Sequence, residues 1–510
     1  MNTFLFSRTR RVGPGVLSIA ASSVLLAACA VGPEYQAPQA ELPAQWDGAA
    51  AESAPGGSRV ETAAVQTRWW GEFGDPLLVE LVERASAANL DVQLAALRVA
   101  QSRAQRDIVA GNRAPNVAAV GSYQRQRQSE LGSGTRLVDA IGAPADQRAA
   151  IIDVLSEPHD VFQAGFDASW ELDLWGRVQR AVESANATLA ASREDLHAAQ
   201  LSLIAEVARV YFELRGVQEQ LRIARDDVQA SETALQLAES RAQGGLVTQL
   251  DVSSQRARLA DARAQLPRLE HQQARLMNAL ALLLAEEPGV LEQRLAAAPA
   301  QPRVPAIVSI GVPSQIARRR PDIRGAESRL QAATAEVGVA VADLYPRITL
   351  TAGFMSEALH AGDLGEWAAR QWHVGPSLHL PIFEGGRRRS VVELRKLQQQ
   401  EAAVSYQRTV LRAWHEIEDA LDAYAAEQRR HRELLVAVAS SRDAYEIATL
   451  HYQHGMTNFL VPLDAQRTML QSERALAESR TAMATHLVSL YKALGGGWEL
   501  ADEHAAAAMR

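Results

Sequence analysis

Apolar residues recur at alternating spacings of four and three along the first half of the chain. From residue 177 to residue 243 there is no proline, and Gly216 is the only glycine. A heptad held this long predicts a coiled coil with left-handed twist. At 1.5 Å per residue its first helix would be on the order of 100 Å long. Gly244-Gly245 ends it, and a second helix follows, so we expect a helix pair over 176–285. The heptad positions are Leu203, Val207, Val210, Leu214, Val217, Leu221, Ala224, Val228 and Leu235.

The same order of elements occurs twice, in residues 71–290 and in residues 291–498. A Pro-rich stretch around Pro299 separates the two copies. Agreement at one offset over a long stretch predicts an internal duplication. The second copy has the weaker heptads, because Glu427 and His431 interrupt them. The pairs at an offset of 210 are Gly176-Arg177 with Gly386-Arg387, Glu206-Val207 with Glu416-Ile417, Gly245 with Gly455, and Leu250 with Leu460.

Four segments lose the helical period and are predicted as strands. Between the first two, residues 127–159 are polar and aperiodic, which indicates a long exposed loop with one helical turn at most. Asp75 and Asn89 stand where helix caps are expected. A second helix pair is expected over 386–494. The predicted strands are about 115–126, 160–175, 346–355 and 371–383.

The N-terminus indicates export. Arg8, Arg10 and Arg11 precede an apolar stretch that is too short for a membrane anchor and ends in Leu-Ala-Ala-Cys29. We therefore expect residues 1–28 to be a signal peptide that is removed. Cys29 is the only cysteine, which excludes intrachain disulfides and a metal site of Cys type. Its context resembles the bacterial lipobox, whose cysteine carries acyl and diacylglycerol lipid; the alternative is a chance cysteine in a leader. Ala30 follows Cys29. An Asp at this position would have resembled a signal for retention at the inner membrane.

Charge and hydropathy exclude two classes of function. Removing residues 1–28 takes away three arginines and no acids, so the formal charge changes from −8 to −11, which argues against nucleic acid as a partner. After Cys29 no apolar run reaches the length of a transmembrane helix, so a membrane crossing would need strands closed into a barrel. Four strands are too few for a barrel of about eight or more, and protomers must then pool their strands. Residues 29–70 are expected to form an extended, lipid-anchored segment, and 499–510 a C-terminal tail.

Several short strings, taken together and in order, resemble the TolC-like outer-membrane efflux proteins. The resemblance is to the lipoprotein branch that serves resistance-nodulation-division (RND) pumps, the OprM and NodT type, and it covers nearly the whole mature chain. The strings are Cys29-Ala-Val-Gly-Pro-Glu-Tyr35, Trp69-Trp70, Phe73-Gly-Asp-Pro-Leu77, Trp170-Glu-Leu-Asp-Leu-Trp-Gly-Arg177, Arg319-Arg-Pro-Asp-Ile-Arg324, Leu380-Pro-Ile-Phe-Glu-Gly-Gly-Arg387, Leu463-Asp-Ala-Gln-Arg467 and Tyr491-Lys-Ala-Leu-Gly-Gly-Gly-Trp498.

The resemblance implies an α+β membrane protein that works as a homotrimer. Its twelve-stranded outer-membrane barrel, four strands per chain, would be continuous with a long helical barrel of coiled-coil hairpins in the periplasm. It also implies partners, a periplasmic adaptor protein and an inner-membrane RND pump. The function implied is an exit duct for drugs or other small toxic compounds, with no cofactor besides the lipid on Cys29 and no catalysis.

The resemblance also implies a periplasmic gate at the turns between paired helices. By match to the family, Asp464 is the ring aspartate and Leu460 the apolar constriction. Asp251 and Tyr452 match positions that hydrogen-bond between helix pairs in the closed state. The alternatives are an Asp464 that offsets the helix dipole from the first turn of its helix, a helix-start Asp251 and a surface Tyr452.

Two departures from the family lie at the same turn: Thr457 stands where some members have a latch arginine, and Val461 stands where TolC itself has a second ring aspartate. They predict a weaker or differently wired latch.

Three further features were weighed. The arginines of the Arg318–Asp322 cluster are expected in solvent, with Pro321 and Asp322 starting a helix. His451 and His454 stand one turn apart but lack a third metal ligand. His415-Glu416 lacks the second histidine of a zinc-protease motif, and neither a phosphate loop nor a nucleophile elbow is present, so an enzyme is not expected.

Two alternatives to efflux remain at this stage. The first keeps the architecture and exports proteins, as a TolC-type duct for type I secretion. The second is a coiled-coil lipoprotein scaffold or adhesin without a pore, which needs neither alternating strands nor a duplication. The sequence does not specify the exported compounds, because the pump usually selects them.

Overall fold

The computed structural model describes residues 30–38, 46, 58–132, 138, 144–296, 304–313 and 319–499. The predicted signal peptide, Cys29 and nearly all of the C-terminal tail lie outside these residues. The chain divides into two compact units. The sheet unit consists of Met1–Gln36, Arg103–Ala187 and Gln331–Glu401, and the hairpin unit of Ala37–Ser102, Thr188–Leu330 and Ala402–Arg510.

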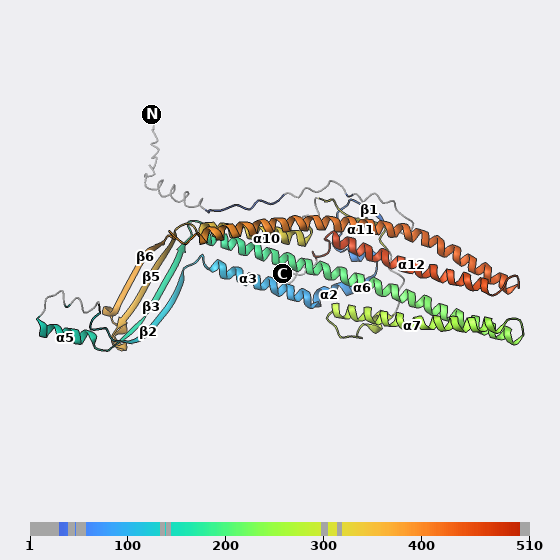
Figure 1. The fold of residues 1–510 in the computed structure, drawn as a ribbon, viewed down its shortest axis with the longest axis horizontal. Helices are drawn as coiled ribbons and strands as arrows, with labels where there is room; N and C mark the ends of the chain where they lie inside the picture. Colours follow the sequence, from blue (N-terminus) through green and yellow to red (C-terminus); the bar gives the residue numbers. More distant parts are fainter. Residues whose placement is uncertain are drawn as a thin grey trace, which may run out of the picture. The chain divides into compact units, whose positions relative to one another are not determined.

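One antiparallel sheet, ordered β2-β3-β5-β6, dominates the sheet unit (Figure 1). Its two middle strands each have two neighbours within the chain, whereas β2 and β6 are the edges. All four strands lie within a few residues of the predicted ranges. They are β2 (Asn116–Gln126), β3 (His159–Leu172), β5 (Arg347–Ala358) and β6 (Arg370–His379).

Two strands end earlier than predicted, for different reasons. β3 ends at Leu172 rather than at 175, because the Asp173 carboxylate accepts hydrogen bonds from the backbone N–H groups of Val178 and Gln179 and so caps the next helix. β6 ends at His379 rather than at 383. Pro381 follows closely and has no N–H to donate to a ladder.

The sheet has one apolar and one polar face. Phe166 of β3 lies opposite Phe354 of β5, which lies opposite Trp372 of β6, and these three aromatic side chains are exposed in the single chain. On the other face, Gln163 donates a hydrogen bond to Glu357, with 2.7 Å between Nε2 and Oε2. Such alternation suits a sheet with lipid on one side and water on the other.

The remaining elements agree with the predicted order. The two long helix pairs are two hairpins, which we call hairpin 1 (α6 and α7) and hairpin 2 (α11 and α12), and α6 and α11 each run through both units. The helices are α2 (Pro76–Ala88), α3 (Leu90–Gly111), α5 (Ala145–Ser156), α6 (Arg177–Gln243), α7 (Gln249–Leu283), α8 (Glu292–Ala296), α10 (Pro321–Ala342), α11 (Arg387–Gln453) and α12 (Leu460–Ala493). Short elements are β1 (Arg59–Glu61), β4 (Ile307–Ser309), η2 (Trp69–Phe73), η3 (Ala361–Gly365) and η4 (Trp367–Ala369).

One local expectation was wrong, and one strand pairing was not predicted. The loop over 127–159 contains α5, a helix of 12 residues rather than a single turn. The N-terminal segment contains β1, which pairs in parallel with β4 from the Pro-rich region between the repeats, Arg59 opposite Ile307. Local periodicity misses β1 because its partner lies far away in sequence.

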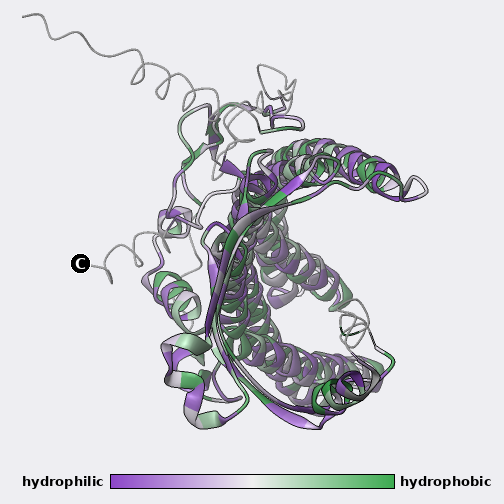
Figure 2. Cartoon of the chain, turned by 90° about the vertical axis from the view of Figure 1, so that its left-hand side faces the viewer, coloured by the Kyte–Doolittle hydropathy of each residue, from purple (hydrophilic) through white to green (hydrophobic). Residues whose placement is uncertain are grey.

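Hydrophilic and hydrophobic residues alternate along the long helices (Figure 2). Within the part of the chain that the structure describes, no helix has the length and apolarity needed to cross a membrane.

The core of the hairpin unit unites two of the sequence strings. Trp69 and Trp70 are fully buried, and the ring of Trp69 stacks on Tyr491 of α12 with 5.1 Å between centroids. The Trp69 indole N–H donates to the carbonyl oxygen of Gly496, at 3.0 Å. The short helix η2, which begins at Trp69, is thereby fixed to the end of α12 and to the turn that follows it.

The expectation that the arginines of the Arg318–Asp322 cluster lie in solvent was wrong for the two that the structure describes. Arg320 is buried, donates to the carbonyl oxygen of Ala493, at 2.8 Å, and pairs with Asp322 and Glu416. Burial opposes its charge, but the two carboxylates raise the pKa of Arg320 above its usual value. Arg319 pairs with Glu499, at 2.6 Å. These arginines join the start of α10 to the end of α12.

Glu427 and His431, which interrupt the heptads of the second copy, form a buried polar layer in hairpin 2 together with Ser479. The Ser479 hydroxyl donates to Glu427, with 2.5 Å between oxygens, and lies 3.3 Å from Nδ1 of His431. Because that hydroxyl has one proton and gives it to Glu427, the His431 ring must donate to Ser479. Burial and nearby Arg480 hold the pKa of His431 below its usual value, against the opposite effect of Glu427. The layer keeps a neutral histidine in the seam.

Gly216, the single glycine of the long heptad, lies where α6 meets α12. A methyl group added at Gly216 would overlap the side chain of Thr481. Because only glycine lets the two helices approach this closely, the position marks a tight crossing between hairpin 1 and hairpin 2.

We expect Gly216→Ala to destabilise the hairpin unit by about 1 kcal/mol, since overpacking costs about 1–3 kcal/mol and exceeds the gain in helix propensity. Thermal unfolding followed by helical circular dichroism measures the effect. In the Thr481→Ala background the overlap is relieved, and the same substitution should cost nothing. Equal costs in both backgrounds would contradict a tight crossing at this pair.

Candidate functional site: hairpin tips and groove

The tips of the two hairpins have the same backbone geometry. At the first, the N–H of Leu246 bonds to the carbonyl of Arg241, at 2.9 Å, and Gly245 has a φ of 71°. At the second, Met456 bonds to His451, also at 2.9 Å, and Gly455 has a φ of 73°. Both are helix ends of the Schellman type, in which glycine takes the left-handed conformation. Because both turns need a residue in this conformation, glycine occurs at both positions, and Gly245 and Gly455 match at an offset of 210.

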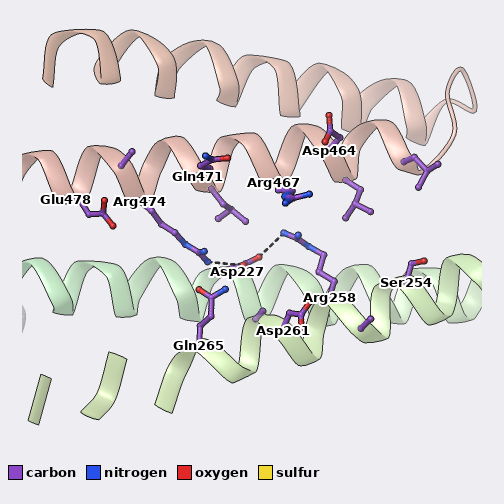
Figure 3. A pocket seen from close by; sticks show the side chains of 16 residues that line it. Asp227, Ser254, Arg258, Asp261, Gln265, Asp464, Arg467, Gln471, Arg474 and Glu478 are labelled. Atoms are coloured by element: carbon purple, nitrogen blue, oxygen red, sulfur yellow. Dashed lines mark hydrogen bonds and ion pairs between the residues drawn. The ribbon is translucent and has the colours of Figure 1, made fainter. Parts of the chain in front are cut away.

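The predicted gate residues lie at the second tip. Leu460 is the first residue of α12 and is 60% exposed, and the equivalent Leu250 of the first tip is 74% exposed. Asp464 is exposed on the second turn of α12, so the alternative that placed it in the first turn was wrong. In Figure 3 its carboxylate points away from Asp227. The position equivalent to Asp464 in the first copy is Ser254, so the two tips differ in charge here.

Asp251 has a local role at the start of α7. Its carboxylate accepts hydrogen bonds from the hydroxyl and the backbone N–H of Thr248, at 2.7 Å and 2.9 Å, and the Thr248 hydroxyl accepts from the backbone N–H of Asp251. This reciprocal pair is a capping box. The hydrogen bonds from Thr248 lower the pKa of Asp251, which therefore stays ionised at neutral pH. Within this chain Asp251 therefore acts as a residue that starts a helix, which is the alternative interpretation given above.

Tyr452 connects the two hairpins through a residue that the sequence did not indicate. The guanidinium of Arg241, at the end of α6, lies 4.6 Å from the centroid of the Tyr452 ring. The ring also makes an edge contact with Phe459, at 5.2 Å between centroids. A cation–π contact of this kind contributes about 0.5–1 kcal/mol at an exposed site. No local pattern points to Arg241, because its partner belongs to the other repeat.

A groove of about 1270 Å³ lies between α7 and α12 (Figure 3). Asp227 of α6 forms its floor and is 6% exposed. One carboxylate oxygen lies 3.2 Å from Arg258 of α7, and the other lies 3.3 Å from Arg474 of α12. Leu460, Asp464 and Arg467 line the end of the groove near the tip. Asp227 therefore connects hairpin 1 to hairpin 2 by charge.

The two departures from the family pattern lie beside the gate residues. Thr457 is half-buried in the turn, and Val461 is 47% exposed on the first turn of α12. His451 and His454 are both exposed. Across the residues that the structure describes, no three His, Cys, Asp or Glu side chains gather in a way that would hold a metal ion.

Comparison with known proteins now identifies the family. The family model described as "Outer membrane efflux protein" matches residues 81–286 and 312–496, one segment in each repeat. The chain belongs to this family. It is 33% identical over 481 residues to the outer membrane protein OprJ of Pseudomonas aeruginosa, covering 94% of this chain and 95% of the relative. The pyoverdine export outer membrane protein OpmQ of Pseudomonas putida is 35% identical over 435 residues, covering 85% and 88%.

Solved structures agree on the fold. The outer-membrane channel OprN superposes with a TM-score of 0.83 at 34% identity, covering 92% of this chain and 100% of that chain. The open state of the MtrE outer membrane channel of Neisseria gonorrhoeae gives 0.77 at 28% identity, covering 92% and 99%. The predictions of a TolC-like fold, an outer-membrane location and a role in efflux are confirmed. The family is one of transport channels rather than enzymes.

Proposed function

We propose that this outer-membrane efflux channel is the exit duct of a tripartite system, in which a periplasmic adaptor and an inner-membrane RND pump deliver small toxic compounds to it. The amphipathic sheet carries the proposal. Its edge strands β2 and β6 have backbone groups that pair with no other strand of the described chain, and those groups need partners in a membrane. Three copies that pool their strands meet this need.

The relatives support a small-molecule cargo. Proteins 32% identical to this chain are named as an antibiotic efflux pump outer membrane protein and a toluene efflux pump outer membrane protein, both from Pseudomonas putida. Others are named for the export of pyoverdine. We infer a cargo of small organic compounds, selected by the pump.

Deletion of the gene tests this function. With the partner pump expressed, the strain should become several-fold more sensitive to part of a panel of antibiotics, dyes, detergents and organic solvents. Complementation with the intact gene is the control. Unchanged sensitivity to every compound, together with unchanged siderophore release, would contradict the efflux proposal.

We also propose that Cys29 carries the lipid anchor. The residues that follow it are fixed on the sheet unit, since the N–H of Val31 donates to the carbonyl oxygen of Trp175, at 3.1 Å. Ala30 packs on Gly176 and Gly32 on Gly338, where a Cβ at Gly32 would lie 2.6 Å from a backbone atom. Acyl chains on the preceding residue would thus start beside the end of β3, close to the membrane.

Intact mass spectrometry of the mature protein checks the anchor. We expect loss of residues 1–28 and added mass equal to diacylglycerol plus one acyl chain. Cys29→Ser should abolish the added mass. A mature protein that keeps residues 1–28, or that lacks lipid, would contradict this assignment.

We propose that Asp464 forms the charged ring of the closed tip and Leu460 its apolar constriction, with Tyr452 and Asp251 as latch residues. Three carboxylates at short range attract cations and repel one another. The exposed position of Asp464 one turn beyond Leu460 supports this assignment. Within the chain, the contact between Arg241 and Tyr452 supplies a latch that does not need the missing arginine at Thr457.

Conductance measurements in planar bilayers test the ring. Asp464→Ala should raise single-channel conductance and weaken block by divalent cations about tenfold, because the ring charge is lost. Ser254→Ala, at the equivalent position of hairpin 1, is the matched control and should leave both unchanged. Identical currents for wild type and Asp464→Ala would argue against the ring.

A further inference from the structure

We propose that Asp227 is a second latch of the channel, placed well away from the tips, and that opening requires the ion pair between Asp227 and Arg474 to break. The proposal rests on the channel function above. It assigns a positioning role to a buried side chain rather than to the exposed tip residues.

The contacts of Asp227 bridge three helices of the hairpin unit. Its side chain is 7% exposed, and those of Arg258 and Arg474 are 20% and 32% exposed. Ser231, on the next turn of α6, donates a hydrogen bond to the same carboxylate, at 3.5 Å. Since the carboxylate is largely shielded from water, the charge interaction is stronger than that of a fully exposed surface pair. Arg258 belongs to hairpin 1, so of the two ion pairs of Asp227 it is the one with Arg474 that joins the two hairpins.

The Asp227 carboxylate also neutralises two positive charges that would otherwise repel each other. Arg258 and Arg474 approach the same carboxylate from opposite sides of the groove (Figure 3). Without that negative charge the two guanidinium groups face each other and repel. Loss of Asp227 therefore pushes the hairpins apart, whereas loss of Arg474 merely unties them. Loss of Arg258 leaves the tie in place.

The position of the bridge gives it leverage over the gate. Thr481, at the tight crossing with Gly216, lies seven residues from Arg474 along α12, which is about 10 Å of helix. Asp464 lies 17 residues from Thr481, about 25 Å along the same helix. If α12 pivots at Thr481, a separation of about 4 Å at Arg474 becomes about 10 Å at Asp464 by this proportion of helix lengths. Breaking this ion pair thus removes a restraint on the part of α12 that carries the ring residue.

A set of substitutions separates a latch from a merely structural ion pair. Single-channel recordings give the open probability of Asp227→Asn, Arg474→Gln, Arg258→Gln and the double variant Asp227→Asn/Arg258→Gln. We expect Arg474→Gln to raise the open probability about fivefold, the effect of losing about 1 kcal/mol. Asp227→Asn should raise it further through repulsion. The open probability of the double variant should fall back toward that of Arg474→Gln, because one of the two facing cations is gone.

A matched control removes another ion pair of the same helix. Glu232 of α6 pairs with Arg263 of α7 at 2.7 Å, entirely within hairpin 1. Glu232→Gln should leave the open probability at the wild-type value. Arg258→Gln should also stay close to wild type, since the pair between Asp227 and Arg474 remains.

Three outcomes overturn the latch. They are an unchanged open probability in Arg474→Gln, equal effects of Arg258→Gln and Arg474→Gln, and a double variant at least as open as Asp227→Asn. If Asp227→Asn fails to reach the outer membrane, the two arginine variants decide the question, because both keep the buried carboxylate. Failure of the channel function is distinct: wild type and Asp464→Ala would then show no current at all.

Discussion

A backbone amide or carbonyl group exposed to lipid costs several kcal/mol, and the structure of this chain depends on how its sheet meets that constraint. The four strands form one continuous sheet with an apolar and a polar face, but β2 and β6 remain edges. We propose that these edges pair with strands of other copies of the chain. Three chains supply the twelve strands of the family's barrel. On this proposal, trimerisation is a condition for membrane insertion.

The hairpin unit uses the duplicated sequence unequally. Hairpin 1 buries Asp227 beside Ser231, whereas hairpin 2 buries a polar layer of Glu427, His431 and Ser479. The two hairpins are connected by the Gly216 crossing, by the bridge through Asp227 and by the contact between Arg241 and Tyr452. One crossing is steric and permanent, while the two charged contacts can break. Such an arrangement lets hairpin 2 move as a lever without separation from the rest of the chain.

Sequence periodicity predicted the elements that have strong local signals. The long heptads, the helix caps at Asp75 and Asn89 and the four strands fall close to their predicted places. What it missed depends on partners distant in the sequence. β1 needs β4, Arg320 needs the end of α12, and Asp227 is adjacent to an apolar heptad position with nothing to show that two arginines converge on it. The gate residues came from family resemblance, and the structure adds the roles of Thr248 and Arg241 beside them.

We propose that open sheet edges force three copies of this chain into one channel. Native mass spectrometry of the protein extracted from outer membranes in mild detergent tests it most directly. We expect a single assembly of three chains that dissociates only when the strands unfold. A folded monomer with an intact sheet, or a stable assembly with another number of chains, would contradict it.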